Sequence, residues 1–412
     1  MYSTKVIFIN KEVKVCLTFL FLIFFYNLYL SYVHYDPVNF FTGDGVTYKE
    51  LSEKLFNEFK YYEDFPIEYP YRAWRTPGYP FFLFFLKFFS IETANEIFVL
   101  NQFFLISTYL ILLKIIFLCS PKTNLLNLFL ILIIYISHIN DQFLYYIHNH
   151  NEPFYIFLIA LGIYLIIKSL IVKKERFLIF GLLVLSFSCL VRTPTLSITT
   201  LVLIILYIST FFKIINISSK KIILYSAIFY IFPLLWMIRN YYVLDHFPFF
   251  LGSQSTHLLL GTFRYIDWEY IDTFAYDRIV EFKDQFEIIR PSLITEAAIS
   301  RILEDPIYYI NSRIINFLRY LINNYSFFSL ALIPLFLFKN LSFRSMVKKS
   351  IKFASFKNNF LIIYALAISI IFLIEMSFTF YVPRYGIIPS IFIMLFANIL
   401  IIKVLEFNKY KI

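Results

Sequence analysis

The sequence predicts an all-α protein that crosses a membrane about ten times. Its 412 residues are 60% hydrophobic and 22% aromatic, which is more apolar surface than a water-soluble domain can bury. Apolar stretches recur along the chain, and about 20 such residues form a helix that crosses roughly 30 Å of hydrocarbon. These stretches lie near residues 13–33, 96–118, 124–139, 153–171, 176–191, 194–212, 222–238, 325–338, 360–380 and 386–405. With no internal repeat or low-complexity linker, residues 1–412 are expected to form one transmembrane domain.

Two stretches need a decision about whether they cross. The run 13–33 is too long for a secretory signal and lacks a small-residue cleavage site, so it is expected to be a retained span. The run Pro80–Phe89 is too short to cross securely and is expected to be a juxtamembrane helix. If it did cross, there would be eleven spans and the topology downstream would invert.

Basic residues set the expected orientation. With the N-terminus inside, the clusters of Lys and Arg between spans all fall on the cytoplasmic side, as the positive-inside rule requires. They lie near residues 122, 168–176, 213–221, 344–357 and 409–411. Both termini are therefore expected in the cytoplasm, with two large external loops at 34–95 and 239–324. The net charge of +10 is explained by anionic membrane lipids, and nucleic acid is not an expected partner.

Both external loops are expected to contain helices. Thr47 and Glu50 have the spacing of a capping box, and apolar residues follow at helical spacing. We expect an amphipathic helix on the outer membrane surface. In the second loop, the stretch Glu296–Tyr320 predicts one or two amphipathic helices broken around Asp305-Pro306.

Candidate chemical groups gather in the first loop. Asp44 stands between two glycines that allow close approach of a ligand, and its carboxylate suits a general base toward an acceptor hydroxyl. The alternative is a turn or helix-start residue. Arg72 and Arg75, with the rings of Trp74 and Tyr79 nearby, suit a phosphate because a guanidinium donates two hydrogen bonds at once. The competing interpretation is anchoring at the membrane interface.

A short polar loop places His148, His150 and Glu152 at alternate positions, so they share one side of an extended segment. A divalent metal is conceivable there, but hydrogen bonding is the more common use of such residues. We therefore expect no cofactor, and we interpret all three as substrate-binding. The three cysteines lie in apolar runs without CxxC spacing, which favours neither disulfides nor a thiolate metal site.

Three arginines, Arg192, Arg239 and Arg384, fall at the outer ends of expected spans. The positive-inside rule disfavours arginines on the outer side of the membrane. Binding of an anionic lipid phosphate near the surface would explain their presence there. Snorkelling of the side chain to the interface is the alternative.

The order of these motifs resembles the C-type superfamily of integral-membrane glycosyltransferases, which includes the dolichyl-phosphate-mannose protein mannosyltransferases and the bacterial aminoarabinose transferases. The motifs are DxxxY at 44–48, RTPGYP at 75–80, EPFY at 152–155, LVRTP at 190–194, WMIRNY at 236–241 and PRY at 383–385. The chain departs from bacterial members at 252–257, where GSQSTH stands. Fewer spans are expected than in the larger members.

The resemblance implies an inverting transfer of a sugar from a polyprenyl-phosphate donor to a hydroxyl of a lipid, glycan or protein acceptor. Asp44 would be the base. The residues expected to bind the substrate are Tyr48, Arg75, Tyr79, His148, His150, Glu152, Arg192, Arg239, Arg384 and Tyr385. The expected place is a bacterial cytoplasmic membrane, with the site on its outer face. Rival classes are a polysaccharide polymerase or ligase, and a transporter, which would carry ionisable groups at mid-membrane.

Overall fold

The computed structural model describes residues 44–62, 75–119, 150–172, 174–211, 218–244, 295–296 and 298–323, with scattered positions between 18 and 41. All regular secondary structure in these residues is α-helical, as the sequence predicts. The helices are α2 (Asp44–Glu58), α3 (Gly78–Lys87), α4 (Ala94–Cys119), α6 (Glu152–Val172), α7 (Glu175–Val191), α8 (Pro194–Phe211), α9 (Ser219–Leu244) and α13 (Pro306–Asn323).

Five of the expected spans coincide with helices: α4, α6, α7, α8 and α9. Among the described residues, three helices have the length and apolar character that a membrane crossing needs, within Ala94–Leu112, Glu152–Ser169 and Lys220–Leu244. This is consistent with a membrane protein. The expected spans at 124–139, 325–338, 360–380 and 386–405 lie outside the described residues, and 13–33 is described only at scattered positions.

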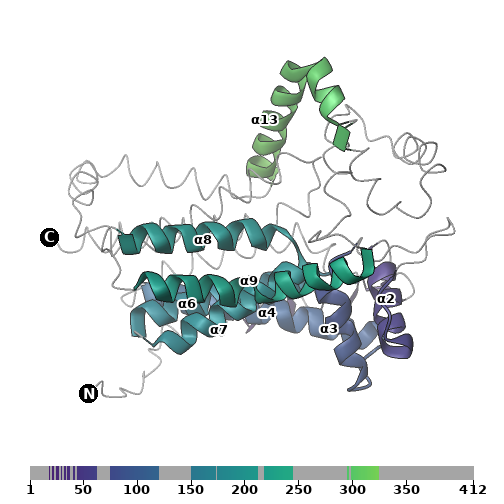
Figure 1. The fold of residues 1–412 in the computed structure, drawn as a ribbon. Coiled ribbons are helices and arrows are strands. Elements are labelled where there is room, and N and C mark those ends of the chain that lie inside the picture. The colour runs from purple at the N-terminus through teal and green to yellow at the C-terminus, as the bar shows by residue number, and fades with distance from the viewer. Residues whose placement is uncertain are drawn as a thin grey trace, which may run out of the picture.

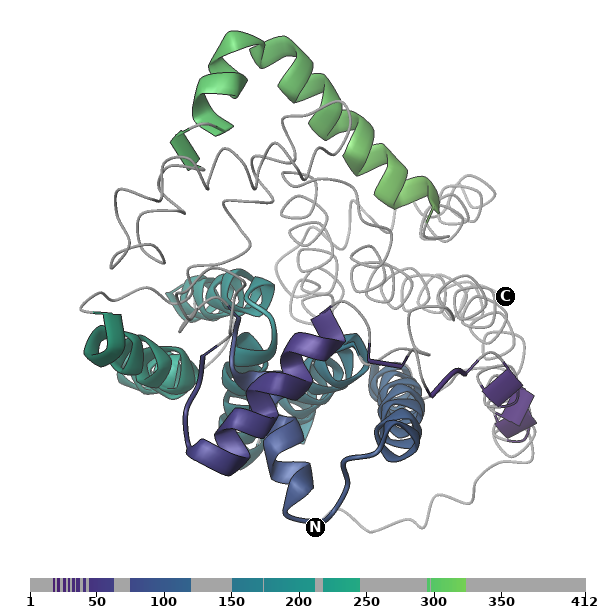
Figure 2. The same ribbon diagram turned by 90° about the vertical axis from the view of Figure 1, so that its right-hand side faces the viewer.

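The five long helices lie side by side with roughly parallel axes, and the short helices α2 and α3 lie at one end of them (Figure 1). Helix α7 is central, because it packs against α6, α9, α8 and α3. Seen along the bundle, α2 runs across the helix ends, and α13 stands apart from the bundle (Figure 2). Helix α3 has 10 residues and is therefore about 15 Å long, which is too short to cross a bilayer.

Two glycines allow α6 and α7 to approach closely. A Cβ atom on Gly162 would come within 2.6 Å of the Leu185 side chain, and one on Gly181 within 2.9 Å of the Gly162 carbonyl oxygen. Small residues at a helix contact are a common way to bring backbones together in membrane proteins. The two antiparallel helices therefore form a fixed pair, with the start of α6 beside the end of α7.

The helix starts show where capping rules succeed and fail. The predicted cap at Thr47 is wrong, because α2 already begins at Asp44, where a carboxylate interacts favourably with the helix dipole. A reciprocal capping box instead starts α4: the Thr93 amide donates to Glu96 Oε2 at 2.9 Å, and the Glu96 amide donates to Thr93 Oγ1 at 3.3 Å. The break at Asp305 is confirmed, since its Oδ1 accepts from the Tyr308 amide at 2.9 Å at the start of α13.

The glycine contact predicts a selective loss of stability. Gly181→Val places a branched side chain against the backbone of α6, and overpacking of this kind costs about 1–3 kcal/mol. Thermal unfolding in detergent should therefore occur at a lower temperature than in the unmodified protein. The matched control is Phe180→Leu on the same helix, where the side chain is 59% exposed and little change is expected. Equal unfolding temperatures for all three proteins would contradict the tight α6–α7 contact.

Candidate functional site

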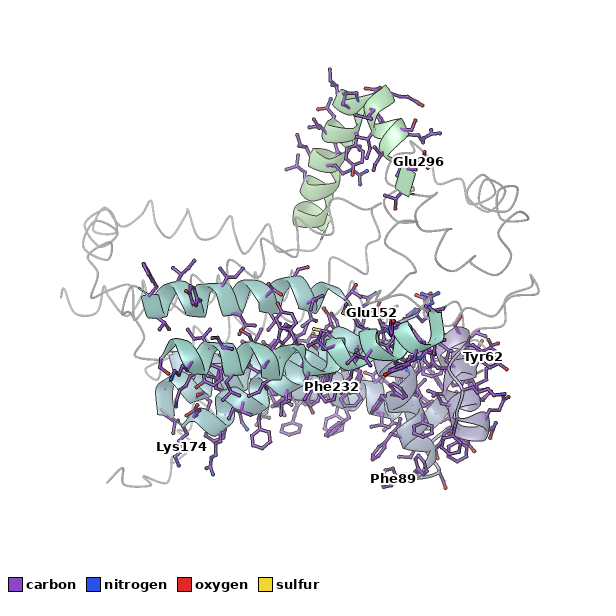
Figure 3. The ribbon with its side chains drawn as sticks, in the orientation of Figure 1. Tyr62, Phe89, Glu152, Lys174, Phe232 and Glu296 are labelled. Carbon is purple, nitrogen blue, oxygen red and sulfur yellow. The ribbon has the colours of Figure 1, made fainter. Side chains whose placement is uncertain are left out.

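Six polar or charged residues gather at the end of the bundle where α6 begins and α7 ends, close to α2. Figure 3 places Glu152 toward this end, with Tyr62 beyond it and Lys174 at the opposite end of the bundle. We call these residues the polar cluster. Its members are Asp44, Tyr48, Arg75, Asn151, Glu152 and Arg192.

Two members of the cluster form a largely buried ion pair between helices. Arg192 Nη2 lies 3.1 Å from Glu152 Oε1, and the exposed fraction of the Glu152 side chain is 2%. Glu152 is the first residue of α6 and Arg192 directly follows the last residue of α7. Each charge therefore sits at the helix end whose dipole favours it. The guanidinium also lies over the Tyr155 ring, 6.0 Å from its centroid.

A second pair, Asp44 with Arg75, joins the start of α2 to the segment before α3. Arg75 Nη2 donates to Asp44 Oδ1 at 2.9 Å, and both side chains are about one quarter exposed, at 26% and 24%. This pair is more accessible than the Glu152–Arg192 pair. A solute at the end of the bundle can therefore reach the Asp44 carboxylate and the Arg75 guanidinium.

Asn151 and Tyr48 connect the two ion pairs. The Asn151 amide nitrogen donates to the Tyr48 hydroxyl at 3.0 Å and lies 3.3 Å from the Val191 carbonyl oxygen. The Tyr48 ring stands 6.0 Å from the Arg75 guanidinium carbon. The same Val191 oxygen accepts a hydrogen bond from Thr76 Oγ1 at 3.1 Å. Hydrogen bonds thus tie four segments that are distant in sequence into one site.

Gly78 fixes how closely the Arg75 segment approaches α7. A Cβ atom at this position would lie 2.5 Å from the Leu190 carbonyl carbon and 2.6 Å from the Val191 amide nitrogen. These are backbone atoms and cannot move aside, so the position requires glycine. The next residue, Tyr79, is fully buried and packs edge-on against Tyr48 with 5.2 Å between ring centroids.

The cluster holds the Tyr48 hydroxyl in its neutral form. Burial is the main cause that raises the pKa of Tyr48 above that of a free tyrosine, and the Asp44 carboxylate adds to it, while Arg75 and Arg192 oppose it. Burial raises the pKa of Tyr79 in the same way. Both phenols therefore keep their protons at physiological pH and remain hydrogen-bond donors.

The structure brings some predicted site residues together and separates others. Asp44, Tyr48, Arg75, Tyr79, Glu152 and Arg192 adjoin one another in or beside the polar cluster. His150 is buried next to Asn151. Arg239 lies elsewhere: its Nη2 donates to the Tyr61 carbonyl oxygen at 3.0 Å, and it stacks on Trp236 at 4.7 Å. His148, Arg384 and Tyr385 lie outside the described residues.

The sequence predicts no role for two residues, Asn151 and Thr195, that the structure places in or beside the site. Asn151 is 3% exposed and hydrogen bonds to Tyr48, whereas the sequence predicts roles only for its neighbours His150 and Glu152. Thr195 Oγ1 donates to the Tyr155 hydroxyl at 2.8 Å, which orients the ring beneath Arg192. A polar side chain directly before a helix that begins Glu-Pro is a signal that could have identified Asn151 as a helix-start residue.

The described part of the chain contains no group of three or more His, Cys, Asp or Glu side chains placed to hold a metal ion. The expectation that the protein needs no metal stays a prediction. The groups present are two carboxylates, two guanidiniums and two neutral phenols. Together they can accept a proton from a hydroxyl and bind an anion.

These observations define a helical, apolar protein with a paired acid–arginine site at one end of its bundle. Neither a protein-family model nor a curated protein sequence matches the chain.

The buried ion pair yields a prediction about stability. Arg192→Gln leaves the Glu152 carboxylate buried without its cation, and breaking a buried pair in this way costs about 3–5 kcal/mol. The expected result is a large fall in the temperature of thermal unfolding. Glu152→Gln combined with Arg192→Gln removes both charges and should recover much of the loss.

The matched control for this cycle is the exposed pair of Lys221 with Glu175, whose side chains are 50% and 40% exposed. Lys221→Gln should hardly change the temperature of thermal unfolding, because exposed pairs contribute little. If Arg192→Gln were as mild as Lys221→Gln, the Glu152–Arg192 pair would not be a structural centre of the site.

Proposed function

We propose that this protein is a membrane-bound glycosyltransferase that moves a sugar from a polyprenyl-phosphate donor to an acceptor hydroxyl, with inversion at the anomeric carbon. The observation that carries the proposal is the pairing of Asp44 with Arg75 beside the pairing of Glu152 with Arg192. The resemblance of the motifs at 44–48, 75–80, 152–155 and 190–194 to C-type glycosyltransferases supports the same reaction.

The proposed reaction requires a base and a cationic site within reach of one another. Asp44 accepts the proton of the acceptor hydroxyl, and the oxygen of that hydroxyl attacks the anomeric carbon. The bond from that carbon to the phosphate oxygen breaks, and the phosphate leaves with the electron pair. Arg75 and Arg192 stabilise the negative charge that develops on it. A common site is supported by the hydrogen bonds between the two pairs. Asn151, next to Glu152, donates to Tyr48 on the helix of Asp44. Thr76, next to Arg75, donates to the carbonyl before Arg192.

The Asp44–Arg75 pair also links donor binding to the base. In the free protein, Arg75 Nη2 donates to Asp44 Oδ1 at 2.9 Å. When a donor phosphate binds, Arg75 turns part of its hydrogen bonding to that phosphate, which leaves Asp44 Oδ1 available to accept the proton of the acceptor hydroxyl. Glu152 remains paired and acts by orienting Arg192.

Apolar helices beside the polar cluster support a substrate carried by lipid. Three described helices are long and apolar enough to cross a membrane, and one of them, α6, starts at Glu152. A polyprenyl chain can remain among such helices while its phosphate reaches the cluster. The acceptor is a lipid, glycan or protein hydroxyl that arrives from the non-cytoplasmic side.

Transfer of labelled sugar tests the role of Asp44. The purified protein is incubated with a panel of radiolabelled polyprenyl-phosphate sugars, and release of the label from lipid is measured. Asp44→Asn should lower the transfer rate by about 10²-fold or more, because it removes the base. Glu50→Gln is the matched control, since Glu50 is an exposed carboxylate on the same helix. Full activity of Asp44→Asn, or no transfer by the unmodified protein with any donor, would refute the mechanism.

Donor saturation tests the role of Arg192. Arg192→Lys keeps a positive charge near Glu152 but loses the planar fork that binds a phosphate with two hydrogen bonds. The apparent KM for the donor should rise by about tenfold, while the acceptor KM changes little. Arg176→Lys, at the opposite end of α7, is the control. An unchanged donor KM would remove Arg192 from the donor site.

A further inference from the structure

A second feature at this end of the bundle is an open groove of about 1030 Å³ between α9, the end of α2, α3 and α7. Its walls are mainly apolar and aromatic, including Phe81, Phe187, Leu190, Phe232 and Trp236. One wall residue, Leu235, is 55% exposed, so the groove opens on the flank of a helix that qualifies as a membrane span.

The groove runs along the helix axis. The α9 residues that line it are Phe232, Leu235, Trp236, Arg239 and Val243, which recur every three or four residues on one helix face. From Arg239 to Phe232 this face is about 10 Å long at 1.5 Å per residue. One leaflet is about half of the roughly 30 Å hydrocarbon core. The groove therefore follows the direction of a lipid chain and can hold the part of it nearest the headgroup.

Charge selects the headgroup. Among the described residues that line the groove, Lys60 and Arg239 carry the charges, and both are positive. Arg239 is held in place by its bond to the Tyr61 carbonyl and by its stacking on Trp236. Lys60 has an exposed ion pair with Glu58 at 3.6 Å, which costs little to exchange. An anion bound by Arg239 would lie about 10 Å from Phe232 along the axis of α9.

The groove is separate from the polar cluster. None of its described lining residues is Asp44, Arg75, Glu152 or Arg192, so a headgroup at Arg239 does not occupy the proposed transfer site. The two are linked through Tyr61, whose carbonyl accepts from Arg239 and whose hydroxyl donates to the Arg75 carbonyl at 3.0 Å. We infer that the groove binds an anionic phospholipid of the bilayer, with one acyl chain along α9 and its phosphate between Arg239 and Lys60.

Lipid retention tests the inference without any enzyme assay. The full chain is reconstituted in nanodiscs with equal amounts of phosphatidylglycerol and phosphatidylcholine, released, and examined by native mass spectrometry. Phosphatidylglycerol should remain bound in preference to phosphatidylcholine. Arg239→Gln and Lys60→Gln should each weaken its retention by about fivefold, since a basic residue near the headgroups contributes on that scale.

Two further variants separate the groove from general charge and folding effects. Lys49→Gln removes an α2 cation that does not line this groove, and retention should be unchanged. Leu235→Trp fills the groove from its exposed side and should reduce retention of both lipids, with thermal unfolding used to confirm that the protein is folded. Equal retention of the two phospholipids by the unmodified protein would overturn the inference. So would an unaffected Arg239→Gln, or displacement of phosphatidylglycerol by a polyprenyl phosphate at equal concentration.

Discussion

The close contact of α6 with α7 is the constraint on which the site depends. Gly162 and Gly181 let the two helix backbones meet where any larger residue would collide with a carbonyl oxygen or a branched side chain. Because the helices are antiparallel and joined by a short connection, the start of one must lie beside the end of the other. Glu152 and Arg192 are therefore neighbours by topology, and the 3.1 Å ion pair follows from helix packing. Gly78 then sets the distance at which the Arg75 segment meets the same end of α7.

Burying charged groups lowers the stability of an apolar protein. Burying a carboxylate to 2% exposure carries a desolvation cost that its partner only partly offsets, and apolar residues of similar size would stabilise the fold at least as well. The cluster also holds a second acid–arginine pair and the phenol of Tyr48, against which the buried Tyr79 packs. Burial is the main cause that raises the pKa of both phenols. Concentrating ionisable groups at one place among apolar helices favours a chemical role over a purely structural one.

Hydropathy predicted the described long helices because a span must be apolar over its whole length. It also placed Glu152 and Arg192 at the same end, since alternating spans reverse direction. What it missed depends on contacts between distant segments: the bond from Arg239 to Tyr61 joins residues 178 positions apart, and nothing local indicates it. The error at Thr47 is of another kind. A capping pattern requires a helix start, and Asp44 provides one earlier, whereas the true box at Thr93 and Glu96 went unrecognised.

The arginines that the sequence grouped together divide by their partners. Arg75 and Arg192 each face a carboxylate, so their charge is balanced at rest and becomes available to an anion only by exchange. Arg239 instead stacks on Trp236 and donates hydrogen bonds to the Tyr61 carbonyl oxygen and to Asn240 Oδ1. The first arrangement fits the proposed exchange of each arginine between its carboxylate and a donor phosphate. The second fits the proposed lipid site, because the guanidinium is held in one orientation by an aromatic ring beside apolar walls. Tyr61 contacts Arg239 through its carbonyl oxygen and the Arg75 backbone through its hydroxyl. A lipid bound in the groove would therefore act, through Tyr61, on the backbone that carries Arg75.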